Sequence, residues 1–199
     1  MSINIEKFAG VDDFRTYINR PWRRDSKLYA TNGHFMIEID DDGRDAAPFE
    51  KQPDCVGLFA KYTPGDFMPI PPLAAPVHCQ WCKGRGACYR KACPDCDGQG
   101  EFAHGMYDYD CKRCEGDGYF LFPTAPPGEK ETRCSACYGL GEEVRKDQGT
   151  PVGELLVATR LLRVLTELPG IEVAVCKAPE ALWFRFTGGR GLVMPMRKG

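Results

Sequence analysis

The sequence predicts an α+β domain made of two halves and interrupted by a zinc-stabilised β-hairpin arm. Three observations lead to this fold class. Four Cys-x-x-Cys-x-Gly-x-Gly units lie in the middle of the 199-residue chain, a hairpin signal at Asn32-Gly33 precedes them, and both flanks show a helix followed by strands. We expect residues 1–75 and 146–199 to form the two halves of one domain, and residues 76–145 to form the zinc domain.

Composition limits the class of protein. Hydrophobic residues make up 43% of the chain, enough for a packed core, and no apolar run approaches eighteen residues, so no membrane span is expected. The N-terminus lacks the basic and then apolar pattern of a secretory signal. The formal net charge is −2, and the most basic segment, 146–199, carries only +3. A nucleic-acid partner is therefore possible but not favoured by charge.

The cysteines indicate metal thiolates in a reducing cytoplasm. Eight of the eleven cysteines fall in CxxC pairs, in a chain without a secretion signal. Redox-active CxxC motifs are the alternative, but four copies that all keep both glycines favour zinc. We expect Cys55, Cys88 and Cys176 to be small core or surface thiols. His78 and His104 lie near the sites but are not expected to be ligands, because eight thiolates already fill them.

Each Cys-x-x-Cys-x-Gly-x-Gly unit, here called a knuckle, can supply two zinc ligands. A tight turn brings both thiolates to one ion and points backbone N–H groups at the sulfurs, and the glycines permit positive φ. Tetrahedral zinc needs four ligands, so four knuckles predict two closed, structural sites and two zinc ions per chain. The eight candidate ligands are Cys79, Cys82, Cys93, Cys96, Cys111, Cys114, Cys134 and Cys137.

Residues 76–145 resemble the cysteine-rich zinc domain of DnaJ-type co-chaperones, on the four knuckles. The resemblance implies that the first and fourth knuckles share an outer zinc (Cys79, Cys82, Cys134, Cys137) and that the second and third share an inner one (Cys93, Cys96, Cys111, Cys114). That family uses the domain to contact unfolded polypeptide and partner chaperones. No histidine here is followed by the Pro-Asp of a J-domain, and the Gly/Phe-rich linker is missing, so stimulation of a chaperone ATPase is not implied.

Nested pairing of this kind would explain why the knuckles lie mid-chain. Cys79 and Cys137 would be neighbours, so the two ends of the module would lie side by side, and the module could occupy a surface loop of its host. Residues 69–76, rich in proline, are expected to form a stiff lead-in, and Lys146–Gly149 the way out.

In the first flank, residues 12–20 are expected to form a short helix with Asp12 near its N-cap. Strands are expected at 27–30 and 34–39, around the Asn32-Gly33 turn. Between helix and strands, residues 20–24 predict a solvated loop with one buried indole, that of Trp22.

In the second flank, Thr150-Pro151 predicts the N-terminus of a helix that runs to Leu168. Its apolar stripe would be formed by leucines, with Arg160, Arg163 and Glu167 on the opposite face. Strands are expected at 171–177, 181–187 and 190–196, with Gly188-Gly189 as the last turn. Because both flanks place a helix before strands, the sequence predicts a two-fold pseudo-repeat.

Two short stretches resemble bacterial DNA polymerase sliding clamps. Residues 29–34 (YATNGH) are similar to the Ala-Thr-Asp-Gly-His hairpin of clamps, and residues 192–197 (LVMPMR) to their C-terminal Val-Met-Pro-Met-Arg strand. The resemblance implies a clamp-like domain whose two segments line a peptide cleft. Asn32 and Phe35 depart from the family pattern, and an ordinary hairpin and edge strand remain the alternative. The candidate cleft residues are Thr31, Gly33, His34, Val193, Met194, Pro195 and Met196.

No phosphate loop, dinucleotide motif or nucleophile elbow is present, so we expect no enzyme. The first hypothesis is a zinc-binding protein-interaction module with a protein or peptide partner, a monomer or small oligomer, in a replication or mobile-element setting by analogy with clamps. The second is a chaperone-like or thiol-redox protein that binds unfolded polypeptide. A nucleic-acid binder ranks last, because each four-thiolate zinc site would add about −2 to an already acidic segment.

Overall fold

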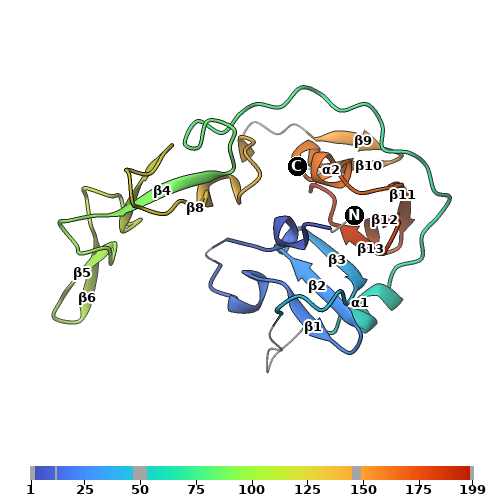
Figure 1. The fold of residues 1–199 in the computed structure, drawn as a ribbon, viewed down its shortest axis with the longest axis horizontal. Coiled ribbons are helices and arrows are strands. Elements are labelled where there is room, and N and C mark those ends of the chain that lie inside the picture. Colours follow the sequence, from blue (N-terminus) through green and yellow to red (C-terminus); the bar gives the residue numbers. More distant parts are fainter. Residues whose placement is uncertain (1–2, 12, 47–52, 145–148, 198–199) are drawn as a thin grey trace. The chain divides into compact units, whose positions relative to one another are not determined.

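The computed structural model describes residues 3–11, 13–46, 53–144 and 149–197 (Figure 1). The chain divides into two compact units. Met1–Val77 and Val144–Gly199 together form the first, here called the sheet unit, and His78–Glu143 form the second, here called the cysteine unit. The described residues are mostly β-structure with few helices, so the sequence overestimated the helical share of the fold. None of the described helices is long and apolar enough to cross a membrane.

A six-stranded antiparallel sheet organises the sheet unit, in the order β1-β2-β3-β13-β12-β11. Each half of the chain supplies a meander of three strands, and the third strands of the two meanders, β3 and β13, pair with each other. The arrangement is a pseudo-two-fold repeat about the β3–β13 junction. The strands are β1 Trp22–Arg24, β2 Lys27–Thr31, β3 Phe35–Asp40, β11 Glu172–Lys177, β12 Glu180–Phe186 and β13 Gly189–Val193.

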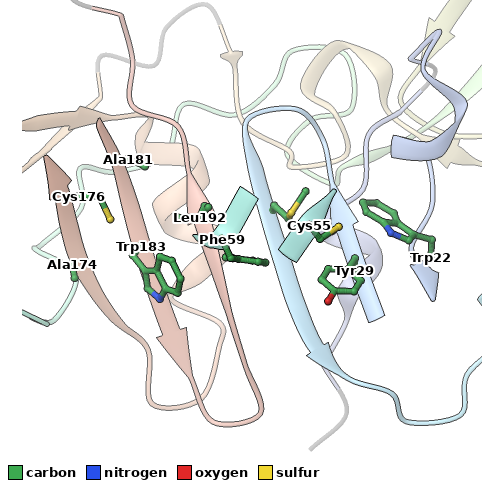
Figure 2. Close-up of a cluster of buried hydrophobic side chains, with 10 residues drawn as sticks. Trp22, Tyr29, Cys55, Phe59, Ala174, Cys176, Ala181, Trp183 and Leu192 are labelled. Carbon is green, nitrogen blue, oxygen red and sulfur yellow. The ribbon is translucent and has the colours of Figure 1, made fainter. Parts of the chain in front are cut away.

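One face of the sheet carries an aromatic layer (Figure 2). Trp22 and Tyr29 stack with ring centroids 6.0 Å apart, and Phe59 of helix α1 (Cys55–Ala60) meets Trp183 edge-on at 5.5 Å. Cys55 and Cys176 are buried in this layer, so both are core thiols. The buried indole predicted at Trp22 is confirmed, but the solvated loop predicted around it is wrong, because Trp22–Arg24 form strand β1 and pair with β2. Alternation along each strand sends the neighbouring side chains to the other face.

The opposite face is covered by the 3-10 helix η1 (Ile5–Phe8). The ring of Phe8 packs against Phe35 of β3 at 4.9 Å. Lys7 of η1 forms an ion pair with Glu167, just beyond helix α2 (Thr159–Leu165). Both helical segments precede a three-stranded meander, which is the order that the pseudo-repeat predicts.

The first hairpin is confirmed, since β2 and β3 pair in register around Asn32-Gly33. The predicted helix over 12–20 is reduced to a 3-10 turn, η2 (Thr16–Ile18), and Asp12 lies outside the described residues. The last turn consists of Thr187-Gly188, because Gly189 already pairs with Phe186.

The helix predicted from Thr150 is wrong in its first half. β9 (Thr150–Val152) and β10 (Leu155–Val157) form a hairpin around Gly153, whose φ of 58° suits a tight turn. Helix α2 begins only at Thr159. Arg160 is 8% exposed and therefore does not lie on a solvated face as predicted.

Strands 171–177 and 181–187 are confirmed to within a residue or two, as β11 and β12. The strand predicted over 190–196 ends at Val193, and it is central rather than an edge strand, since β13 pairs with both β3 and β12. Of the predicted way out, residues 146–148 lie outside the described residues.

The cysteine unit contains a three-stranded sheet in the order β7-β4-β8 and a separate hairpin, β5-β6. The strands are β4 Ala87–Ala92, β5 Glu101–His104, β6 Tyr107–Asp110, β7 Tyr119–Phe122 and β8 Thr132–Arg133, and a 3-10 turn, η3, covers Ser135–Cys137. These strands are short and leave no large apolar core between them, and the buried clusters of the unit consist of its cysteines.

The β3–β13 junction predicts a sharp effect at Gly191. A Cβ at this position would lie 2.1 Å from Cζ of Phe184 and 2.3 Å from the carbonyl oxygen of Met36. We expect Gly191→Ala to lower the free energy of unfolding by about 3 kcal/mol, measured by urea denaturation. Gly43→Ala is the control, because a Cβ there meets nothing within 4 Å and only its φ of 80° opposes alanine, at about 1 kcal/mol. An equal loss of unfolding free energy in the two variants would contradict the close packing at the β3–β13 junction.

Candidate metal centres

The eight knuckle cysteines come together as two groups of four. In each group the four sulfur atoms lie within 4.8 Å of one another, and every cysteine is buried. The outer group takes one pair from the first knuckle and one from the fourth, and the inner group takes its pairs from the second and third. The groups are Cys79, Cys82, Cys134 and Cys137, and Cys93, Cys96, Cys111 and Cys114.

The sulfur spacing fits tetrahedral zinc. The Sγ atoms of Cys82 and Cys137 are 3.7 Å apart, and those of Cys96 and Cys114 are 3.8 Å apart. A zinc–sulfur bond of about 2.3 Å in tetrahedral geometry requires sulfur–sulfur edges of about 3.8 Å. A disulfide would need about 2.0 Å. Each group could therefore hold one metal ion, and the four-thiolate donor set suits zinc.

The sequence of each knuckle shapes its turn. In each knuckle, the residue after the second cysteine is not glycine and yet has a left-handed backbone conformation, such as Asp97 with φ 50°. Both glycines that follow also have positive φ. This run curls the backbone around the sulfur, so that the N–H of the second glycine donates to it. The N–H of Gly100 lies 3.3 Å from Sγ of Cys96, and that of Gly118 lies 3.2 Å from Sγ of Cys114. Such donors stabilise a thiolate.

The outer group repeats this pattern. The N–H of Gly86 lies 3.3 Å from Sγ of Cys82, and the N–H of Gly141 lies 3.2 Å from Sγ of Cys137. All four knuckles therefore make the backbone-to-sulfur contact that the sequence predicts for them.

Paired knuckles also bond to each other through their backbones. The N–H of Cys93 donates to the carbonyl of Gly118 at 2.8 Å, and the N–H of Cys111 donates to the carbonyl of Gly100 at 2.7 Å. The two chains approach so closely that a Cβ on Gly100 would lie 2.2 Å from the carbonyl oxygen of Gly116. The second glycine is thus required by the close approach of the neighbouring knuckle as well as by its own φ.

The same reciprocal bonds close the outer group. The N–H of Cys79 donates to the carbonyl of Gly141 at 2.8 Å, and the N–H of Cys134 donates to Gly86 at 2.9 Å. His78 and Glu142 form a β-bridge just outside them. The two ends of the cysteine unit are therefore adjacent, as nested pairing requires.

Electrostatics favour a cation in these groups. Burial raises the pKa of Cys79, and it raises that of Cys114 to about 11. A hydrogen bond with Cys137 lowers the pKa of Cys134 to about 5, while the pKa of Cys137 rises. Without metal, each group would therefore keep protons that a divalent ion displaces.

Two side chains on adjacent residues of β7 cover the two groups. Leu121 packs on the outer group and Phe120 on the inner one, so alternation along a single strand serves both. Cys88 of β4 is a fifth buried thiol beside the outer group. Cys88 is thus a core thiol, in line with the sequence prediction, whereas the covering roles of Phe120 and Leu121 were not predicted, although the apolar run at 119–122 was a usable signal. No histidine belongs to either group among the described residues.

The two segments with clamp-like sequence lie side by side in the sheet unit. Val193 pairs with Phe35, and the N–H of Met194 donates to the carbonyl of His34 at 2.7 Å. Thr31 is buried and its hydroxyl donates to the Phe35 carbonyl at 2.6 Å. Asn32 accepts from the N–H groups of His34 and Phe35, so its side chain shapes the turn.

The side chains of these segments differ in exposure. Gly33 and His34 are exposed, Val193 is buried, and Met194, Pro195 and Met196 are half-buried. Tyr62 approaches the sulfur of Met194 at 4.0 Å. Desolvation, followed by the charges of Arg160 and Arg15, lowers the pKa of His34.

Comparison with known proteins adds no family to this description. No family model, no curated protein and no solved structure matches the chain. The two four-cysteine groups therefore rest on the motifs and on the geometry above.

The close approach between knuckles predicts different effects for two neighbouring glycines. Gly98 and Gly100 have φ of 83° and 84°, so alanine is strained equally at both. A Cβ at Gly98 would make ordinary contacts with the Cβ of Ala92 at 3.4 Å and the carbonyl oxygen of Gly118 at 3.8 Å, whereas at Gly100 it collides with backbone. We expect Gly100→Ala to weaken zinc binding at least about tenfold more than Gly98→Ala, measured by competition with a chelator. Similar losses would show that φ alone makes glycine necessary.

Metal removal should separate the two units. Structural zinc contributes about 10–16 kcal/mol per site in small peptides, and the cysteine unit has little other core. We expect a chelator to abolish amide-exchange protection within residues 78–143 and to leave β2, β3, β12 and β13 protected. Loss of protection in both units at one chelator concentration would contradict this independence.

Proposed function

We propose that the chain is a non-enzymatic protein-interaction module, in which a zinc-stabilised cysteine unit, inserted in a clamp-like sheet domain, offers a surface to a protein or peptide partner. Four thiolates fill the tetrahedral positions of zinc and leave none for water or substrate. The metal in such a site stabilises the fold, so the function would be carried by what the fold displays.

The observation that carries this proposal is the concentration of exposed apolar side chains on the cysteine unit. It holds seven of the eleven exposed large hydrophobic residues among those that the structure describes. Exposed apolar groups gathered on a small unit are typical of interaction sites. These seven are Trp81, Phe102, Met106, Tyr107, Tyr109, Phe122 and Tyr138.

The resemblance to the DnaJ-type zinc domain supports the same class, because that family contacts polypeptide through this domain. A chaperone-like role is therefore the alternative. Disulfide exchange is less well supported, since the most exposed knuckle cysteines, Cys96 and Cys114, are only 5% exposed, and attack on a disulfide needs an accessible thiolate.

A second candidate function belongs to the sheet unit and is favoured by one observation. The clamp-like segments lie next to each other, joined by the bond between Met194 and His34. In sliding clamps the corresponding segments line a peptide cleft. The two-fold repeat of meanders about β3 and β13 is consistent with such a domain. We therefore propose peptide binding beside Thr31–His34 and Val193–Met196 as a second activity.

A displayed library of random peptides, selected on the zinc-loaded full chain, tests these proposals. We expect selected peptides to slow amide exchange within residues 78–143, because the exposed apolar side chains lie there. Protection near 31–35 and 193–197 instead would favour the second candidate. Failure to select any peptide above background would contradict a binding module. As a control, the selection is repeated after the zinc has been removed with a chelator. It should then enrich none of the peptides that bind the cysteine unit.

The oligomeric state tests whether the clamp resemblance extends to a ring. Both cleft-like segments here belong to one domain, so no second copy is needed to bring them together. A ring around DNA would also need a basic lining, and the most basic segment carries only +3. We expect light scattering to give a monomer or small oligomer. A stable hexamer would contradict this and would make DNA tethering the leading function.

A further inference from the structure

The β5-β6 hairpin is an exposed projection of the cysteine unit. Glu101 pairs with Asp110 and His104 with Tyr107, around a Gly105-Met106 turn. Every residue of both strands is exposed, although several are aromatic. Figure 1 shows the hairpin at the end of the cysteine unit away from the start of β4. The packing of its side chains does not stabilise this hairpin, because neither of its faces covers an apolar layer.

The two faces of this hairpin differ in chemistry. Paired residues share a face and alternate residues share a face. One face therefore carries the aromatic and imidazole rings, and the other carries the carboxylates. The ring face comprises Phe102, His104, Tyr107 and Tyr109, and the carboxylate face comprises Glu101, Asp108 and Asp110, with Ala103 between them.

The region is strongly acidic. Residues 93–118, which include the inner metal group and the hairpin, carry seven carboxylates and two basic side chains, a net charge of −5. One carboxylate, that of Asp95, pairs with Arg113 at 2.6 Å. Among the described residues, no ion pair involves the three carboxylates of the hairpin. By contrast, residues 78–92 carry four basic side chains and no carboxylate.

The outer edge of β6 combines both features. Its sequence, Tyr107-Asp108-Tyr109-Asp110, alternates ring and carboxylate, and within the described residues β6 pairs only with β5. A segment added alongside β6 would bond to its free backbone groups and would place successive side chains over a tyrosine and then beside an aspartate. A cationic side chain is attracted at both kinds of position.

We propose that the β6 edge is a docking site for an extended, arginine-bearing segment of a partner protein. This inference rests on the proposed interaction function and specifies its partner. Arginine suits the site better than lysine, because its planar guanidinium stacks on tyrosine rings and bonds carboxylates in a bidentate manner. The acidic surroundings attract such a segment and repel nucleic acid.

The test uses the zinc-loaded full chain and a peptide with four consecutive arginines between Gly-Ser flanks. Analogues replace the arginines with citrulline, which has the same shape without charge, or with leucine. Binding is measured by fluorescence polarisation and located by amide exchange. We expect the arginine peptide to protect residues 101–110 and to bind at least about tenfold more tightly than the citrulline peptide, with an advantage that falls as salt rises.

Double variants of β6 test whether its tyrosines and aspartates bind the peptide. Tyr107→Ser with Tyr109→Ser, and separately Asp108→Asn with Asp110→Asn, should each weaken binding about three- to tenfold. Phe14→Ser and Glu129→Gln are the matched controls, since both side chains are exposed outside the hairpin, and they should change binding less than about twofold. Because all the altered side chains are exposed, every variant should retain its zinc, which metal analysis checks.

The outcomes separate this inference from the proposed function. Equal binding of the leucine or citrulline peptide, or equal losses in the control variants, would overturn the arginine-selective edge. If library peptides protect the cysteine unit while the arginine peptide does not, the inference fails and the interaction module stands. If no peptide protects this unit, both fail.

Discussion

The cysteine unit depends on the close contact between paired knuckles. At each pair, four thiolates lie at the spacing of a zinc tetrahedron, and the same residues exchange backbone hydrogen bonds, as between Cys93 and Gly118. Metal binding by the thiolates and hydrogen bonding between the paired backbones depend on each other. A bound divalent ion would compensate thiolates that burial otherwise keeps protonated, and the glycines let two backbones approach closely enough to share it. A side chain at Gly100 or Gly118 would overlap a backbone oxygen of the opposite knuckle, so the contact is built from glycine on both sides.

Nested pairing has a consequence for the rest of the chain. Because the first knuckle meets the fourth, the unit begins and ends at one place, marked by the bridge between His78 and Glu142. The flanks can then fold together as one sheet across the β3–β13 junction. Entropy favours this arrangement, because a metal-closed insertion holds its ends together and does not burden the host with a long flexible loop. The function that we propose follows from this division, with one unit forming the sheet and the other displaying side chains.

The sequence was most informative where local chemistry decides the structure. The knuckle spacing predicted both metal groups, and Asn32-Gly33 predicted a hairpin in its register, because both signals act over a few residues. It failed at Thr150-Pro151, where helix-start signals were outweighed by a Gly153 turn and by pairing of β9 with β10. It also failed at Arg160, which tertiary packing buries. The ring and carboxylate faces of β5-β6 were present in the sequence as alternation, but only pairing shows that the strands expose both.

The grouping of the sulfur atoms implies that bound metal ions would join the first knuckle to the fourth and the second to the third. Cadmium-113 substitution with proton–cadmium correlation NMR tests it directly, because each metal signal couples only to the cysteines that bind it. Two cadmium signals are expected, one for each group of four cysteines. One should correlate with the β-protons of Cys79, Cys82, Cys134 and Cys137, and the other with those of Cys93, Cys96, Cys111 and Cys114. A single signal, or one that couples Cys82 with Cys93, would contradict it.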